Sequence, residues 1–258
     1  MILDVNGLRV SCENYGDGEN KILMLHGWGC SSEHFRQIAE KLSDRYRILV
    51  PDLPGHGLTG QPKEPWDVDD YADCVLSIME SAGFDRAGVI AHSFGGRIAL
   101  KIASGHPEKI DRMILTGCAG LKKPKTQEQL KKEEEYRKEK ERLLRIGRFP
   151  PLRKYSQVML DDLRRRYGSA DYNALDPGMR ETFVRIVSED LRPCLAGIKC
   201  PVLLVWGRED RETPLWMGET MEKEIPDAGL VVFDNDDHFA YLHQWPRFTT
   251  IAESFLQS

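Results

Sequence analysis

Short apolar runs alternate with amphipathic stretches along most of this chain of 258 residues. Six runs are apolar at almost every position, which is typical of strands covered on both faces: Lys21–Leu25, Tyr46–Val50, Gly88–Ala91, Arg112–Leu115, Val202–Trp206 and Leu230–Phe233. Helical spacing follows most of them, at Ser32–Leu42, Asp69–Ala82, Phe94–Ser104, Pro214–Glu224 and Pro246–Leu256. This alternation predicts an α/β fold with a mostly parallel central sheet and helices on both faces.

The first residues follow a different pattern. Two short extended runs, Met1–Val5 and Leu8–Tyr15, flank Asn6-Gly7, a dipeptide that favours a two-residue hairpin turn. We therefore expect an antiparallel pair at one edge of the sheet. In such sheets ligands bind at the carboxyl ends of the strands, so the loops that follow the apolar runs are where chemistry is expected.

One long segment, from Cys118 to about Leu191, contains no strand-like run. We expect residues 120–190 to form an all-helical lid, or cap, inserted into an α/β core made of residues 1–119 and 191–258. Tyr155, Met159 and Phe183 are expected to line a substrate pocket. Charge is dense over Lys122–Arg142, and acid–base pairs spaced by four residues favour a solvated helix: Glu128/Lys132, Glu133/Arg137, Glu134/Lys138 and Glu141/Arg145. Leu143–Met159 and Tyr172–Val187 are more amphipathic.

Composition narrows the class of protein. The net charge of −5, from 36 Lys+Arg against 41 Asp+Glu, gives no reason to expect a nucleic acid as partner. The 6 cysteines are scattered without a CxxC pair, which argues against a metal or redox centre. No apolar run approaches the length of a membrane span, and no signal-peptide pattern follows the first methionine. We therefore expect a cytoplasmic protein with reduced thiols.

The decapeptide Gly88–Arg97 (GVIAHSFGGR) joins an apolar strand to the start of a helix. Ser93 falls on the turn between them and is flanked by small residues, as in a nucleophile elbow of the general form Gly-x-Ser-x-Gly. Ala91 replaces the first glycine of that form, while Gly95 keeps the second. The alternative is an ordinary strand–helix turn in which the serine caps the helix.

The segment Leu25–Gly29 (LHGWG) also follows an apolar run. Its two glycines allow the backbone to turn and to direct an N–H group inward, which is what a developing oxyanion requires. We expect the backbone N–H groups of Trp28 and Phe94 to form an oxyanion hole.

Polar residues near this segment have two interpretations. We expect His26, together with Asp52 and His56 of the loop after the next run, to brace the two loops by hydrogen bonding. A metal site made by these three residues is the rival hypothesis, but no further cluster of ligands completes it.

Two later loops supply candidates for an acid and a base. Asp210 follows an apolar run in Trp206–Pro214 (WGREDRETP), and Glu209 and Glu212 are the nearby alternatives. The acid could instead follow the preceding apolar run, but the segment there, Leu115–Gly120, contains no carboxylate, and this favours Asp210.

The base is expected in Asp234–Phe239 (DNDDHF), after the last apolar run. His238 is the preferred residue and His243 the fallback. Asp236 and Asp237 would raise the pKa of His238 if they lay close to it.

These motifs, in this order, resemble those of the α/β-hydrolase superfamily, in particular its small, lid-bearing serine esterase-like members. The resemblance covers nearly the whole chain and implies a catalytic triad of Ser93, Asp210 and His238. It further implies acyl transfer to water through an acyl-enzyme, a small-molecule acyl substrate, and no metal or organic cofactor. Resemblance to haloalkane dehalogenases or epoxide hydrolases would require an aspartate at position 93.

Three functions remain open. A carboxylic ester hydrolase is favoured. A peptidase of the aminopeptidase type, or a C–C bond hydrolase of ring-cleavage products, would keep the triad and change the bond. A non-catalytic ligand receptor would keep only the scaffold. The pattern specifies neither the acyl chain length nor the oligomeric state.

Overall fold

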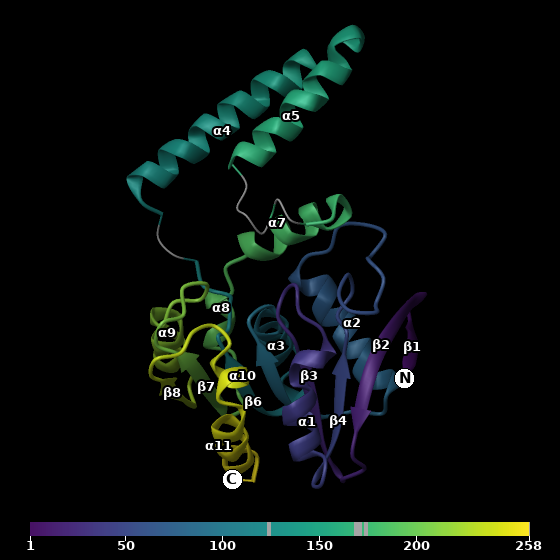
Figure 1. Ribbon diagram of the computed structural model, residues 1–258, viewed down its shortest axis with the longest axis vertical. Coiled ribbons are helices and arrows are strands. Elements are labelled where there is room, and N and C mark those ends of the chain that lie inside the picture. The colour runs from purple at the N-terminus through teal and green to yellow at the C-terminus, as the bar shows by residue number, and fades with distance from the viewer. Residues whose placement is uncertain (123–124, 168–171, 173–174, 258) are drawn as a thin grey trace. The chain divides into compact units, whose positions relative to one another are not determined.

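A single eight-stranded sheet organises the part of the chain that the computed structural model describes, residues 1–122, 125–167, 172 and 175–257 (Figure 1). The strand order is β1-β2-β4-β3-β5-β6-β7-β8, and every pair from β4 to β8 is parallel. This arrangement confirms the predicted fold class. The strands are β1 (Ile2–Val5), β2 (Leu8–Tyr15), β3 (Asn20–Leu25), β4 (Tyr46–Pro51), β5 (Ala87–His92), β6 (Ile110–Thr116), β7 (Val202–Gly207) and β8 (Ala228–Phe233).

The two edges of the sheet differ. At one edge β1 and β2 form the predicted hairpin, and the turn residues Asn6 and Gly7 have φ angles of 54° and 79°, as a two-residue turn requires. At the other edge lies β8, which we predicted to be a central strand covered on each side. The central position is wrong, because β8 pairs only with β7 within the described residues; its side chains, most of them half-buried, still contact both apolar layers.

Two apolar layers cover the sheet, one on each face. Alternate residues of β3 show the division, since Leu23 and Leu25 pack into one layer, and Ile22 and Met24 into the other. The first layer contains α2 (Val68–Ser81), α3 (Phe94–Gly105), α8 (Arg192–Leu195) and α9 (Trp216–Glu224); the second contains η1 (Ser32–Phe35), α1 (Arg36–Leu42), α10 (Ala240–His243) and α11 (Trp245–Gln257). Burial on both faces explains the continuous apolar runs of the central strands.

The chain divides into two compact units, residues 1–121 with 184–258, and residues 122–183. The first unit includes residues 184–190 because Ile186 belongs to its core, and the Leu191 N–H donates to the Gly120 carbonyl over 2.8 Å. The predicted insertion, residues 120–190, therefore exceeds the second unit at both ends. Its role as a lid stays a prediction.

The second unit is helical where it is described. It contains α4 (Gln127–Ile146), η3 (Pro150–Leu152), α5 (Arg153–Tyr167), η4 (Pro177–Met179) and the start of α7 (Arg180–Ser188). Leu143, Leu160 and Leu163 form the small apolar cluster between α4 and α5. No helix of the described residues is both long and apolar enough to cross a membrane. Residues 123–124 and 173–174, which fall in predicted helical stretches, lie outside the described residues.

The charged face of α4 follows the sequence pattern in part. Two of the expected ion pairs form, Glu128–Lys132 at 2.9 Å and Glu134–Lys138 at 2.7 Å. Glu133 instead pairs with Lys125 at 2.6 Å, just before the helix. The helix begins at a capping box in which the hydroxyl of Thr126 accepts a hydrogen bond from the Gln129 N–H.

Candidate active site

Ser93 stands on a strained turn between β5 and α3. Its φ and ψ angles are 49° and −107°, a backbone conformation that residues other than glycine rarely adopt. The turn also needs small neighbours, because a Cβ atom at Gly95 would overlap the carbonyl oxygen of Leu25, and one at Gly96 would overlap the thiol of Cys118. Ser93 itself is half-buried, so its hydroxyl is not sealed into the core. This is the geometry of a nucleophile elbow.

His238 and Asp210 lie in the loops that follow the neighbouring strands β8 and β7. Nδ1 of His238 is 2.8 Å from Oδ2 of Asp210, and both side chains are buried. The other carboxylate oxygen, Oδ1, accepts hydrogen bonds from the N–H groups of Glu212 (3.0 Å) and Thr213 (2.9 Å). Because an ionised carboxylate only accepts, this contact favours a proton on Nδ1, and a neutral ring in that tautomer has its lone pair on Nε2.

Thr213 also belongs to this cluster, although sequence reasoning missed it. Its hydroxyl lies 2.8 Å from Oδ2 of Asp210, 3.0 Å from the carbonyl oxygen of Gly117 and 3.1 Å from Nδ1 of His238. The signal in the sequence is the spacing Asp-x-x-Thr, in which the aspartate caps the N–H three residues ahead.

Gly117, at the end of β6, was likewise missed. A Cβ atom there would lie 3.0 Å from Nδ1 of His238 and 3.3 Å from Oδ2 of Asp210, and the φ angle is 49°. The glycine therefore leaves room for the histidine–carboxylate pair, which a side chain at this position would crowd.

The two glutamates considered as alternative acids lie elsewhere in the loop. Oε2 of Glu212 is 3.4 Å from Nε2 of His238, on the opposite side of the ring from Asp210. Its side chain is 70% exposed. Glu209 donates its N–H to the carbonyl oxygen of Asp236 over 2.8 Å. Asp210 is thus the carboxylate whose geometry fits an orienting role at Nδ1.

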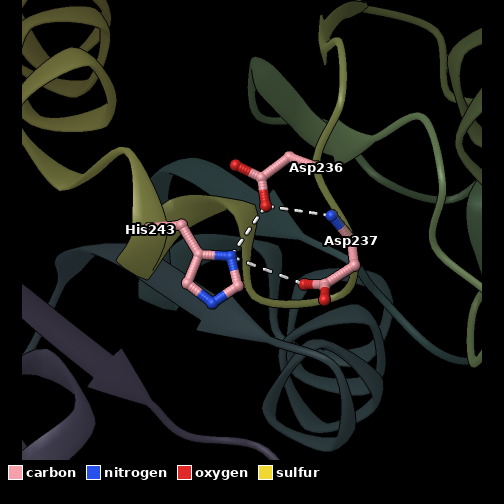
Figure 2. Close-up of side chains that lie close together, drawn as sticks. All are labelled: Asp236, Asp237 and His243. Carbon is pink, nitrogen blue, oxygen red and sulfur yellow. Dashed lines mark hydrogen bonds and ion pairs between the residues drawn. The ribbon is translucent and has the colours of Figure 1, made fainter.

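The fallback histidine, His243, has a separate partner (Figure 2). Its Nδ1 is 2.7 Å from Oδ1 of Asp236 and 3.6 Å from Oδ1 of Asp237. Burial alone would raise the pKa of the Asp236 carboxyl, but hydrogen bonds from His243, Gln244 and the Asp237 N–H outweigh burial and lower it. The two aspartates that we considered as partners of His238 therefore contact His243.

These three side chains are also the one group, among the residues described, whose metal-ligand atoms all lie within 4.8 Å of one another. Both oxygens of Asp236 already accept hydrogen bonds, and Asp237 and His243 are exposed. The cluster is explained as a brace of the loop that carries His238.

His26 and Asp52 tie two loops to the backbone. Nε2 of His26 accepts the Leu53 N–H over 2.9 Å, and Nδ1 lies 2.8 Å from the Gly27 carbonyl oxygen. Desolvation lowers the pKa of His26 to about 3, so the ring is neutral. The oxygens of Asp52 accept the N–H groups of Ser32 (2.7 Å) and Leu58 (2.9 Å). These contacts support the bracing interpretation over the metal site.

The third residue of that rival hypothesis, His56, places its Nδ1 3.1 Å from the Pro54 carbonyl oxygen. Its ring also packs edge-on against the ring of Trp28, with centroids 4.7 Å apart. His56 therefore supports the loop that contains Trp28.

The two proposed oxyanion donors are close neighbours through their side chains. The rings of Trp28 and Phe94 are 5.3 Å apart. Phe94 is the first residue of α3, where the backbone N–H has no partner within the helix. Beside Trp28, a Cβ atom at Gly27 would be 3.4 Å from Cβ of Ser93, so this loop passes directly by the serine. The oxyanion hole itself stays a prediction.

The three predicted pocket residues all belong to the second unit. Tyr155 and Met159 lie on α5, and Phe183 lies on α7. Met159 packs against the small cluster between α4 and α5, whereas Tyr155 is 57% exposed. Their part in substrate binding stays a prediction.

Comparison with known proteins identifies the family. The chain belongs to the α/β-hydrolase family, because the family model described as alpha/beta hydrolase fold matches residues 20–243. This finding confirms the resemblance seen in the sequence motifs.

Several relatives are similar over nearly the whole chain. A 2-hydroxymuconate semialdehyde hydrolase from Pseudomonas sp. strain CF600 is 28% identical over 268 residues, covering 97% of this chain and 91% of the relative. A pimeloyl-(acyl-carrier protein) methyl ester esterase from Neisseria meningitidis is 28% identical over 256 residues, covering 93% and 95%. The solved structure of an esterase from Exiguobacterium antarcticum shares the fold, with a TM-score of 0.76 at 22% identity and coverage of 100% and 99%. The family and these relatives support an enzyme with hydrolase activity.

Proposed function

We propose that this protein is a serine hydrolase that cleaves a carboxylic ester or a related acyl bond of a small molecule. Ser93 is the nucleophile, His238 the base and Asp210 the acid that orients the base. The observation that carries the proposal is the backbone of Ser93, with φ 49° and ψ −107° at the start of α3. Backbone strain of this kind clusters at active sites, whereas a serine that merely capped a helix would have an unstrained, extended backbone.

The proposed mechanism has two steps. Nε2 of His238 takes the proton of the Ser93 hydroxyl as its oxygen attacks the acyl carbon. Asp210 keeps the other imidazole proton on Nδ1 and stabilises the charged ring; the 2.8 Å contact supports this role. The N–H groups of Trp28 and Phe94 stabilise the oxyanion. His238 then protonates the leaving group and activates the water that releases the acyl group.

A second candidate keeps this machinery and breaks a C–C bond. Similarity to the 2-hydroxymuconate semialdehyde hydrolase, at 28% identity, favours it over the remaining alternatives. Similarity to the pimeloyl-(acyl-carrier protein) methyl ester esterase, also at 28%, supports the ester hydrolase equally. An aminopeptidase and a non-catalytic receptor have no such support.

The test is covalent labelling with a small fluorophosphonate, whose adduct resembles the tetrahedral intermediate. We expect one adduct per chain, located on Ser93 by peptide mass analysis, and turnover of a chromogenic acetyl ester. Ser93→Ala should abolish both. His238→Ala should slow labelling strongly, because the base is lost.

His243→Ala is the matched control, since His243 is a histidine five positions away that pairs with Asp236. It should label much faster than His238→Ala, because it loses a brace of the loop but keeps the proposed base. Labelling on another serine, or undiminished labelling of His238→Ala, would assign the chemistry to other residues. A folded protein that is never labelled would favour the receptor.

A further inference from the structure

A carboxylate faces the reactive side of the proposed base. Nε2 is the imidazole nitrogen that would exchange protons with Ser93 and with the leaving group, and Oε2 of Glu212 lies 3.4 Å from it. The backbone of Glu212 is held beside Asp210, because its N–H donates to Oδ1 of Asp210 over 3.0 Å. One loop thus brings a buried carboxylate to Nδ1 and an exposed one to Nε2.

The carboxylate of Glu212 is not engaged by a lysine or arginine in the described residues. Within the described part of the chain, no ion pair joins its carboxylate to a lysine or arginine, and the one ionisable side chain in contact with it is His238, at 3.4 Å. The other ionisable groups close by are Asp210, which is also anionic, and Cys30, whose thiol pKa burial raises to about 11 and so keeps protonated. The charged group in contact with Nε2 is therefore a carboxylate.

We propose that Glu212 is a specificity residue that favours a neutral or cationic leaving group and disfavours an anionic one. The leaving-group oxygen must come within about 3 Å of Nε2 to receive its proton, which brings the alcohol portion of the substrate close to Oε2 of Glu212. The Glu212 carboxylate attracts a positively charged alcohol portion and repels one that carries a carboxylate. The inference rests on the proposed function and specifies its substrate class.

The experiment compares esters that share an acetyl group and differ in the charge of the alcohol. Acetylcholine is cationic, 3,3-dimethylbutyl acetate is its neutral counterpart of similar shape, and O-acetylglycolate is anionic. In Glu212→Gln the ratio of kcat/KM for the cationic to the neutral ester should fall about threefold, as expected for an exposed charge in high dielectric. The anionic ester should improve by a similar factor.

Two controls distinguish the effect of the Glu212 charge beside Nε2 from the effect of removing any negative charge from this loop. Glu209→Gln removes the same charge from the same loop, away from Nε2, and should change the ratios less than about twofold. At about 1 M salt, where the Debye length is about 3 Å, the difference between wild type and Glu212→Gln should shrink.

The outcomes distinguish the two proposals. The specificity role is overturned if Glu212→Gln cleaves the neutral ester with unchanged ratios of kcat/KM between the esters. It is also overturned if Glu209→Gln changes these ratios as much as Glu212→Gln does. Either result leaves the proposed serine hydrolase intact. Protein that neither cleaves an ester nor is labelled on Ser93 overturns both. If Ser93 is labelled but no ester is cleaved, the same ratios are read from labelling rates with cationic and anionic phosphonates.

Discussion

Asp210 contacts His238, the proposed base, with one carboxylate oxygen and its own loop with the other. Oδ2 faces Nδ1 of His238 at 2.8 Å, while Oδ1 accepts two backbone N–H groups at 2.9 and 3.0 Å. In Asp210→Asn the side-chain amide can donate to Nδ1, which favours the tautomer with its proton on Nε2. That tautomer cannot accept the proton of Ser93. Turnover of an acetyl ester should fall by roughly 10³–10⁴-fold in a protein that remains folded.

Circular dichroism and the melting temperature provide the folding check for this variant. Glu209→Asn, a change to the same amide one residue earlier, serves as the control and should retain most of the activity. Near wild-type turnover in Asp210→Asn would move the acid to another residue.

His26 makes stability depend on pH. Its pKa is lowered to about 3 in the folded protein by burial, against the ordinary value of 6.5. Between these values the unfolded chain binds a proton that the folded protein does not, so stability is lost as the pH falls below 6.5. From about pH 7.5 to about pH 5.5 this residue should remove about 1.4 kcal/mol from the free energy of unfolding.

Urea unfolding at the two pH values measures this effect. His26→Asn should be less stable at both, because the Leu53 N–H loses its acceptor. Its further loss on acidification should be smaller than that of the wild type by about the same 1.4 kcal/mol. His26→Asn should still lose some stability on acidification, because burial also holds the pKa of His92 well below its ordinary value. An equal loss in both proteins would contradict the assignment.

At the scale of elements, the proposed site follows from where parallel strands end. β5, β7 and β8 run in the same direction, and their carboxyl ends carry Ser93, Asp210 and His238. The order of strand, helix and motif along the sequence was enough to predict that the acid and the base would meet. The 2.8 Å contact between Asp210 and His238 agrees with that expectation.

Contacts between distant loops could not be read from the same pattern. Thr213 reaches the carbonyl oxygen of Gly117, which lies 96 residues away in the chain. Glu212 was considered only as an alternative acid, because spacing does not tell which nitrogen of His238 a nearby carboxylate faces. Asp236 was considered as a neighbour of His238, but the turn into α10 brings His243 to it instead.

Strand order is a second property that hydrophobicity leaves open. The run at Leu230–Phe233 is as apolar as the central strands, yet β8 lies at the edge of the sheet. An apolar run indicates that both faces of a strand are largely covered. In β8 one face is covered by α9 and the other by the layer that contains α11. An apolar run does not indicate whether the strand has one neighbouring strand or two.

At the scale of the whole molecule, the two units differ in how they are stabilised. The first contains both apolar layers of the sheet. The second has a cluster of three buried leucines, Leu143, Leu160 and Leu163, and a set of exposed ion pairs, each of which contributes about 0–1 kcal/mol. We therefore expect substitutions of exposed side chains in the second unit to change stability little.

The last prediction concerns this second unit as a lid. Met159→Ala and Phe183→Ala should change the preference between short and long acyl esters, because removing a large side chain from a pocket admits a longer chain. The ratio of kcat/KM for an octanoyl ester to that for an acetyl ester should rise about tenfold in at least one variant. The rate at which a small fluorophosphonate labels Ser93 should stay near the wild-type rate, since the reacting groups lie in the first unit.

Leu130→Ala is the matched control, because Leu130 is an apolar residue of the same unit that is 49% exposed on α4. It should leave the chain-length profile unchanged. Met159 also packs against the leucine cluster, so the melting temperature of its variant must be measured to separate a changed pocket from a loosened helix pair. An unaltered profile in both variants would show that neither residue contacts the acyl chain, and a slower labelling of Ser93 would mean that the second unit acts on the chemical step itself.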